Sequence, residues 1–220
     1  MHVTLPSGTP AESALPADGR APTQGLVVIP DIGGLRPLFS TMIQRLADEQ
    51  GWAVCTFEPW PGRQDLNLQQ RLDQVGTLTD ASLLGDASAA ADACGVEPVG
   101  VVGFCMGGMF ALKAAGTGRF ARSVAFYGMI RVPETWRSSG HSEPLDALAS
   151  PEACPTLAII GTADIWTPPE DVADLEAAGV TVVRYEGAGH GFAHDADRPA
   201  HRAEDAADAW RRAVAFLRDA

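Results

Sequence analysis

A cysteine flanked by glycines is the residue in this sequence best suited to nucleophilic chemistry. Cys105 lies at the centre of Gly103-Phe-Cys-Met-Gly-Gly108, between an apolar run at 99–102 and a helix-compatible stretch at 109–115. Glycines two positions before and after a nucleophile let the chain turn sharply from strand to helix and expose the side chain. The N-terminus of the following helix favours a thiolate and a developing oxyanion. The motif alone does not decide the role, because free cysteines are often small buried core residues.

A general base and an acid to orient it follow Cys105 along the chain. Asp164 comes just after the apolar run at 155–160, and His190 follows the run at 180–185. Taken singly, Asp164 also suits a helix cap and His190 an ordinary loop position. Together they complete the order nucleophile, acid, histidine that α/β-hydrolases use. We therefore predict a triad of Cys105, His190 and Asp164.

An early glycine-rich turn is the expected second half of an oxyanion hole. Pro30-Asp-Ile-Gly-Gly34 follows the apolar run at 26–29, where a hydrolase of this order places a backbone N–H donor. We predict that the N–H groups of Ile32 and Met106 together stabilise the oxyanion of a tetrahedral intermediate.

Strands and helices alternate along the sequence in a way that brings these residues together. The pattern predicts helices from Pro37 to Gly51, over 69–94 with an interruption near Gly76, after Cys105, over 168–178 and over 203–217. Buried strands are predicted at 26–29, 52–57, 99–102, 123–127, 155–160 and 180–185. Residues 1–24 suit an edge hairpin or an extended segment, and 129–153 form a long excursion. We expect one α/β domain over 1–220, with three layers and the site at the carboxyl ends of a mostly parallel sheet.

Composition excludes several other classes of function. The chain of 220 residues has 16 Lys and Arg against 28 Asp and Glu, a net charge of −12 that argues against nucleic-acid and anionic-membrane partners. The sequence has no uninterrupted apolar stretch of the roughly 18 residues that a membrane helix needs. The remaining cysteines, Cys55, Cys94 and Cys154, form no C-x-x-C pair and suit core positions. We expect a cytoplasmic protein without disulfides.

The combination of motifs resembles the dienelactone hydrolase family over about residues 25–218. The resemblance is carried by Gly103-Phe-Cys-Met-Gly-Gly108, Ala125-Phe-Tyr-Gly128, Gly161-Thr-Ala-Asp164 and Tyr185-Glu-Gly-Ala-Gly-His-Gly-Phe192. It implies an α/β-hydrolase fold with about eight strands, and a Cys-His-Asp hydrolase of small esters or lactones. It also implies no metal or organic cofactor. We expect a monomer or a homodimer.

Two positions depart from the pattern of that family. Asp31 stands where the founding enzyme has a glutamate that holds the resting thiol, so we expect Asp31 to modulate the thiol. His194 stands four residues after the catalytic histidine, where the family has an arginine that binds a substrate carboxylate. Arg63 and Arg71 are possible replacements for that arginine. Aromatic residues near strand ends are either pocket lining or core, and the candidates are Trp60, Tyr127 and Trp166.

Three other interpretations remain open at the level of sequence. His190 and His194 have the spacing of a helical zinc pair, although Gly189 and Gly191 favour a loop. A glutamine-amidotransferase-like protein also has a cysteine elbow, but its histidine is followed two residues later by glutamate, and Phe192 occupies that place. A non-catalytic thiol-sensing or binding protein of the same fold would not need both Asp164 and His190.

Overall fold

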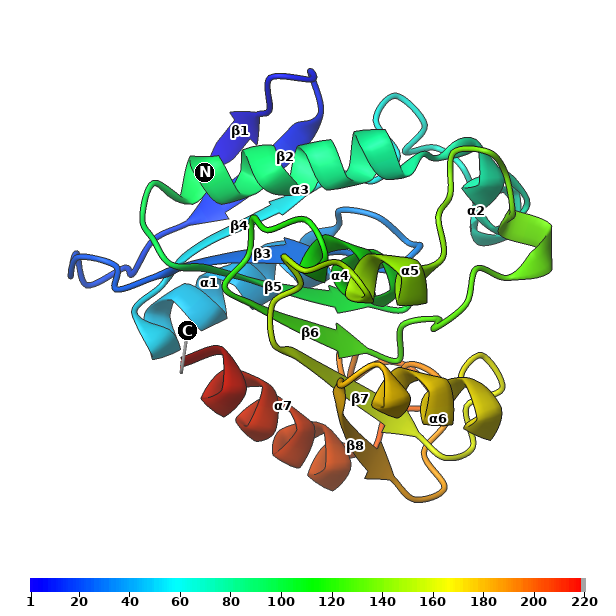
Figure 1. Cartoon of the computed structure of the whole chain (residues 1–220). Coiled ribbons are helices and arrows are strands. Elements are labelled where there is room, and N and C mark those ends of the chain that lie inside the picture. The colour runs from blue at the N-terminus through cyan, green and yellow to red at the C-terminus, as the bar shows by residue number, and fades with distance from the viewer. Residues whose placement is uncertain (219–220) are drawn as a thin grey trace.

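The computed structural model describes residues 1–218, and within them eight strands form one sheet in the order β1-β2-β4-β3-β5-β6-β7-β8 (Figure 1). The strands are β1 (His2–Thr4), β2 (Pro10–Ala14), β3 (Gly25–Ile29), β4 (Ala53–Phe57), β5 (Val99–Phe104), β6 (Arg122–Phe126), β7 (Thr156–Gly161) and β8 (Thr181–Tyr185). The pairs β1–β2 and β2–β4 are antiparallel, and all other neighbours are parallel. The mostly parallel sheet predicted from the alternating pattern is therefore confirmed.

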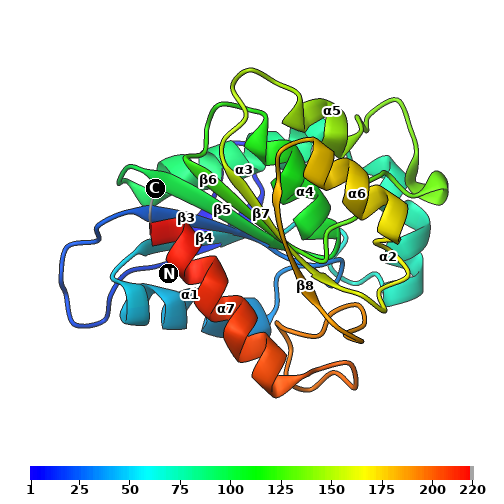
Figure 2. The same ribbon diagram turned by 60° about the horizontal axis from the view of Figure 1, so that its bottom comes forward.

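Helices cover both faces of this sheet. They are α1 (Pro37–Gln50), α2 (Leu68–Gln74), α3 (Asp80–Cys94), α4 (Met106–Ala115), α5 (Pro144–Leu148), α6 (Pro169–Ala177) and α7 (Ala203–Arg218), with short 3-10 turns η1 (Val75–Thr77) and η2 (Glu134–Trp136). α1 and α7 lie together on one face, whereas α3 and α4 lie on the other (Figures 1 and 2). The protein thus has the predicted three layers.

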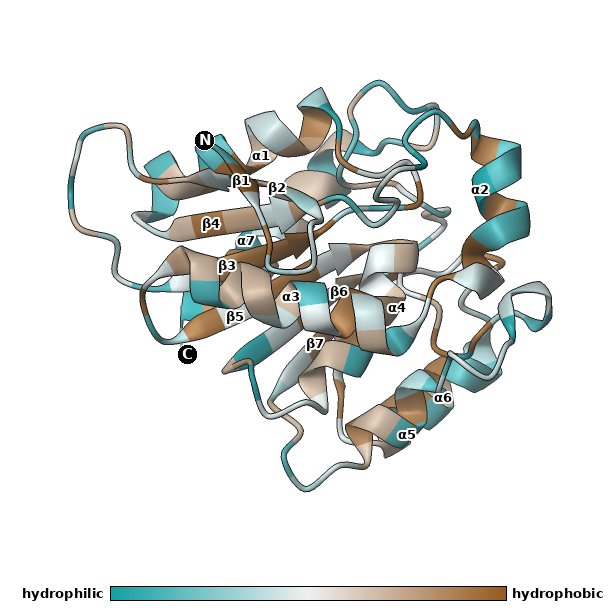
Figure 3. Cartoon of the chain, turned by 90° about the horizontal axis from the view of Figure 1, so that it is seen from above, coloured by the Kyte–Doolittle hydropathy of each residue, from teal (hydrophilic) through white to brown (hydrophobic). Residues whose placement is uncertain are grey.

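Two hydrophobic cores follow from the alternation of side chains along each strand. In β3, Val27 and Ile29 join the core under α3 and α4, while Leu26 and Val28 join the core under α1 and α7. Because both faces are covered, the central strands are hydrophobic throughout rather than alternating, and β3 and β4 are largely brown in Figure 3. No helix among residues 1–218 has the length and apolar character needed to cross a membrane.

The predicted helix boundaries are confirmed at three places with identifiable causes. Pro37 occupies the first turn of α1, and Gly51 ends it in a left-handed conformation at φ 73° with its N–H bonded to the Ala47 carbonyl. The expected interruption near Gly76 falls between α2 and α3. Thr79 then begins α3 by accepting a hydrogen bond from the Ser82 N–H at 3.2 Å.

The excursion at 129–153 is fastened to α3 and α4 by a buried ion pair. Lys113 has a fully buried side chain and donates to Asp80 at 2.6 Å. The other carboxylate oxygen of Asp80 accepts from the Ser142 N–H at 2.7 Å, and His141 lies 3.3 Å from the lysine nitrogen. These bonds hold the excursion over the side of the molecule that carries η1 and α4.

Candidate active site

Cys105 occupies a strained turn between β5 and α4. Its φ of 57° and ψ of −120° lie in a region that residues other than glycine rarely adopt. A Cβ on Gly103 would lie 2.0 Å from the Gly107 carbonyl oxygen, so only glycine allows the chain to turn this tightly. The Cys105 N–H donates to the Phe126 carbonyl at 3.0 Å, which fixes the turn against β6. The sequence prediction of an elbow is confirmed in this backbone geometry.

His190 and Asp164 meet on the loops that follow β8 and β7. The Nδ1–H of His190 donates to Asp164 Oδ2 at 2.8 Å, and the Asp164 side chain is fully buried. The second carboxylate oxygen accepts from the Trp166 N–H at 2.9 Å. A Cβ on Gly161 would lie 2.2 Å from the Ala188 carbonyl, so this glycine lets the two loops approach. Asp164 is therefore held so that it orients the His190 ring.

The electrostatics of His190 favour the protonated ring and therefore the transfer of a thiol proton to it. Burial alone would lower its pKa, but hydrogen bonds with Asp164 and Cys105 outweigh burial and raise the pKa to about 9. Because Asp164 occupies Nδ1, Nε2 is the nitrogen available to the Cys105 thiol. The chain of contacts Asp164, His190 and Cys105 has the order required for nucleophilic catalysis.

The loop after β3 lies directly against the N-terminus of α4. A Cβ on Gly107 would lie 2.3 Å from the carbonyl oxygens of both Ile29 and Pro30, so this contact requires glycine. Within residues 1–218, neither the Ile32 N–H nor the Met106 N–H has a hydrogen-bond acceptor. Two free donors near an elbow are what an oxyanion hole needs.

Three of the proposed substrate-binding residues lie behind this loop. Trp60 is fully buried and its Nε1–H donates to the Ile32 carbonyl at 3.0 Å. Arg71 is also buried and donates to the same carbonyl at 3.2 Å and to two others, those of Leu66 and Gln64. Arg63 lies over the Trp60 ring at 5.1 Å. These contacts hold the loop after β3 in place.

Asp31 contacts Arg36 and His194. Its Oδ1 accepts from Arg36 Nη1 at 2.6 Å and from the Gly33 N–H at 2.8 Å. Its Oδ2 accepts from Arg36 Nη2 at 2.9 Å and from His194 Nε2 at 2.8 Å. Burial acts to raise the pKa of Asp31, but the hydrogen bonds from His194 and Arg36 prevail and hold this pKa far below its usual value. Asp31 is therefore an ionised, fully satisfied carboxylate.

His194 connects Asp31 to Tyr127. Burial lowers the pKa of His194, so the ring is neutral near pH 7; its Nε2–H donates to Asp31, and Nδ1 accepts. The donor to Nδ1 is the Tyr127 hydroxyl at 2.5 Å. Tyr127 is fully buried and has a φ of 40°, an uncommon conformation for tyrosine. Burial raises the pKa of Tyr127 well above its usual value, so the hydroxyl keeps its proton.

Trp166 covers the outer side of His190. Its ring stacks on Trp136 with centroids 6.0 Å apart and lies 6.5 Å from the His190 ring. Trp136 belongs to the excursion at 129–153 and had no signal in the sequence, because nothing local marks which residue will reach a distant loop. Trp166 itself is 39% exposed, so part of its ring is open to a ligand.

The two histidines of the H-x-x-x-H spacing have separate carboxylate partners, Asp164 for His190 and Asp31 for His194. Among residues 1–218, no group of three or more His, Cys, Asp or Glu side chains is arranged to hold a metal ion. The zinc interpretation therefore has no support in the described part of the chain. Burial raises the pKa of Cys55 to about 12 and the pKa values of Cys94 and Cys154 to about 11, which suits unreactive thiols.

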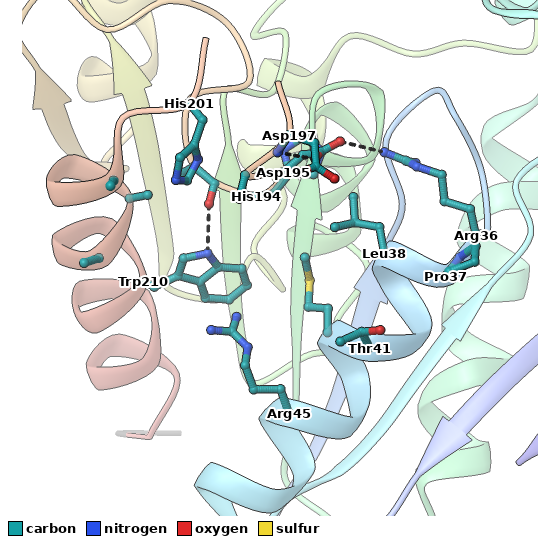
Figure 4. A pocket seen from close by; sticks show the side chains of 16 residues that line it. Arg36, Pro37, Leu38, Thr41, Arg45, His194, Asp195, Asp197, His201 and Trp210 are labelled. Carbon is teal, nitrogen blue, oxygen red and sulfur yellow. Dashed lines mark hydrogen bonds and ion pairs between the residues drawn. The ribbon is translucent and has the colours of Figure 1, made fainter. Parts of the chain in front are cut away.

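A cavity of about 810 Å³ opens between α1 and α7 (Figure 4). Its wall includes Arg36 and His194, and Trp210 lines it from α7 while donating to the Ala193 carbonyl at 3.2 Å. The lining includes neither Cys105 nor His190, so the cavity borders the Asp31 contacts and not the elbow.

The parallel sheet, the strained elbow and the acid and histidine on later loops define an α/β-hydrolase. The sequence matches the dienelactone hydrolase family over residues 11–220, and the chain belongs to that family. A "Probable 2-oxo-3-(5-oxofuran-2-ylidene)propanoate lactonase" of Bradyrhizobium is 30% identical, with 91% of this chain and 84% of the relative covered. A "Putative carboxymethylenebutenolidase" of Methylorubrum extorquens is 32% identical, with 95% and 76% covered.

A solved structure supports the same assignment. The structure of a "Putative Dienelactone Hydrolase" from Klebsiella pneumoniae has a TM-score of 0.87 and 25% identity, and the match covers 100% of this chain and 98% of that one. The predicted α/β-hydrolase fold and family resemblance are confirmed. The protein is a hydrolase that acts on ester bonds, including those of lactones.

Proposed function

We propose that the protein hydrolyses small esters or lactones through an acyl-thioenzyme on Cys105, with His190 as the base and Asp164 as the orienting acid. The observation that carries the proposal is that His190 bonds a buried carboxylate at 2.8 Å and has its pKa raised by Asp164 and by Cys105 of the elbow. A single α/β-hydrolase domain supplies all three groups from the loops at one edge of the sheet. No metal or organic cofactor enters this scheme.

When the reaction begins, His190 Nε2 holds the proton of the Cys105 thiol, as the raised pKa of His190 favours. The thiolate attacks the ester carbonyl carbon, and the carbonyl π electrons move to oxygen, where the N–H groups of Ile32 and Met106 stabilise the charge. Collapse of this intermediate breaks the C–O bond, and His190 gives its proton to the departing oxygen. In a lactone, that oxygen stays attached to the acyl group as a hydroxyl.

Hydrolysis of the thioester completes the cycle. His190 takes a proton from water, the resulting hydroxide attacks the acyl carbon, and collapse of the second intermediate releases a carboxylic acid and the Cys105 thiolate. The products are therefore an acid and an alcohol, or a hydroxy acid from a lactone.

Two side chains expected to bind a substrate carboxylate have other partners. His194 is neutral and bonded on both nitrogens, and Arg71 is committed to three carbonyls, so neither is a free cation for a substrate carboxylate. Arg198 remains as a cation beside the site, because its Nη1 lies 2.7 Å from a Cβ placed on Gly191, next to His190, so both a carboxylated and a neutral lactone belong in the substrate panel.

Trp166 is the proposed substrate contact on the exposed side, and Tyr127 packs against His190 from the inner side, with ring centroids 5.3 Å apart. Trp60 and Arg63 act only through the loop after β3, which they support.

The compartment that we propose is the cytoplasm. Cys55, Cys94, Cys105 and Cys154 are all free thiols in the structure. Reduced cysteines are the rule in that compartment.

A panel of p-nitrophenyl acetate, simple lactones and a carboxylated dienelactone tests the proposal. We expect Cys105→Ala to abolish turnover and Cys154→Ala, which changes a thiol at the far end of the strands, to leave it intact. Cys105→Ala protein that still hydrolyses these substrates at the wild-type rate rules out the mechanism. If the protein is instead a thiol sensor, none of these substrates will show Cys105-dependent turnover, and the Cys105 thiol will undergo reversible oxidation.

A further inference from the structure

Arg36 and Asp31 form a two-point ion pair beside the active site. We propose that Arg36 is a positioning residue that neutralises the Asp31 charge, so that Asp31, which also accepts a hydrogen bond from His194, does not oppose ionisation of Cys105 before substrate binds. The proposal rests on Cys105 being the nucleophile, and it assigns a role to a residue that no motif indicated.

All hydrogen-bonding directions of the Asp31 carboxylate are occupied. Arg36 bonds both oxygens, Gly33 adds a backbone donor to Oδ1, and His194 adds a ring donor to Oδ2. Parallel guanidinium–carboxylate bonds of this kind are stronger and more strictly oriented than a single ion pair. The carboxylate therefore has no bonding capacity left for the Cys105 thiol.

The local backbone is shaped for this pair. A Cβ on Gly33 would lie 2.7 Å from Arg36 Nη1 and 2.9 Å from Asp31 Oδ1, so a side chain there would separate the two groups. Arg36 Nη1 also donates to the Gly34 carbonyl at 3.2 Å. The Asp31 side chain is only 6% exposed and that of Arg36 is 30% exposed, so the pair is only partly screened by water.

The charge of Asp31 is close enough to matter for Cys105. The His194 ring bonds Asp31 at 2.8 Å and stacks on Phe104, the residue before Cys105, with ring centroids 5.0 Å apart. An unpaired carboxylate beside the elbow would disfavour a thiolate. The Arg36 guanidinium supplies the compensating charge.

Other charged and titratable groups also face this pair. Arg36 Nη2 lies 3.8 Å from Asp195 Oδ2, and the positive charge of Arg198 lowers the pKa values of His194 and Tyr127. On the thiol side the groups are His190 and Asp164. Of these groups, only Arg36 and His194 bond Asp31 directly, so substitution of Arg36 changes the Asp31 charge balance most directly.

The test is the rate at which iodoacetamide alkylates Cys105 as a function of pH, followed by mass spectrometry of its peptide in protein without substrate. Arg36→Gln leaves the Asp31 charge uncompensated, and we expect the reactive form to require a higher pH, with about a tenfold lower rate at pH 7. Asp31→Asn removes the carboxylate charge that Arg36 compensates, and we expect the alkylation profile to shift to lower pH. The double variant Asp31→Asn/Arg36→Gln returns to the wild-type profile.

Arg45→Gln is the matched control, because Arg45 lies on the same helix and contacts Trp210 rather than Asp31. Thermal melts identify variants that fail to fold. An unchanged Arg36→Gln profile, or single substitutions that shift the profile in the same direction and do not cancel, overturns the proposal. Because alkylation needs no ester, the expected alkylation profiles together with absent ester turnover count against the proposed function, whereas an unchanged Arg36→Gln profile with normal ester turnover counts against this inference alone.

Discussion

The Tyr127 hydroxyl donates to His194 Nδ1 across 2.5 Å, and both side chains are buried. Tyr127→Phe removes the donor and leaves a neutral ring nitrogen without a partner inside the protein. We expect a loss of about 1–3 kcal/mol in the free energy of unfolding, measured in urea. Tyr185→Phe is the control, because its hydroxyl bonds Asp208, which keeps Arg211 and Arg212 as partners. Equal losses in the two variants would contradict a special role for the His194 bond.

The raised pKa of His190 makes stability depend on pH in a defined window. Its folded-state pKa of about 9 exceeds the unfolded value near 6.5, so protonation favours the folded state. The stabilisation is fully present below pH 6.5 and is lost as the pH rises through 9, with a magnitude of about 3 kcal/mol. Urea unfolding across pH 6 to 10 should show this fall in the wild type and not in His190→Gln.

Urea unfolding over the same pH range also separates the contribution of the Cys105 thiol to the His190 pKa from that of Asp164. In Cys105→Ala, one of the two hydrogen bonds that raise the His190 pKa is absent. The fall in stability should then begin at lower pH, and an unchanged window would show that Asp164 alone sets the His190 pKa.

The contact between Gly107 and the loop after β3 is required for the proposed oxyanion hole. A Cβ at 2.3 Å from two backbone oxygens cannot be accommodated without moving that loop. We expect Gly107→Ala to destabilise the fold by more than about 2 kcal/mol and to reduce ester turnover strongly. Thermal melts and initial rates provide both readouts.

Gly85→Ala is the matched control for this substitution. Gly85 is exposed in α3 and has no atom within 4 Å of an added Cβ, so alanine should stabilise the helix by about 0.5–1 kcal/mol. If Gly107→Ala behaved like this control, the close approach of the two backbone segments would not matter for the site.

The main features of the fold and site could be predicted because their signals are local in sequence. Each of Cys105, Asp164 and His190 directly follows an apolar strand, and parallel strands bring their carboxyl ends to one edge. Arg36 and Trp136 could not be found in this way, because their roles depend on residues that only the tertiary structure brings near. Lys113 was equally hidden: it lies in an apolar helical stretch, and its partner Asp80 is 33 residues away.

Trp166 offers a test of substrate contact that is separable from stability. Its ring stacks on Trp136, faces His190 and stays partly exposed, whereas the neighbouring Ile165 is 85% exposed. We expect Trp166→Ala to raise KM for small esters several-fold while lowering the free energy of unfolding by only about 0.5–1.5 kcal/mol, the contribution of an aromatic pair. Ile165→Ala should change neither quantity. If Trp166→Ala left KM unchanged and lowered only stability, Trp166 would be a packing residue and the substrate would bind elsewhere around His190.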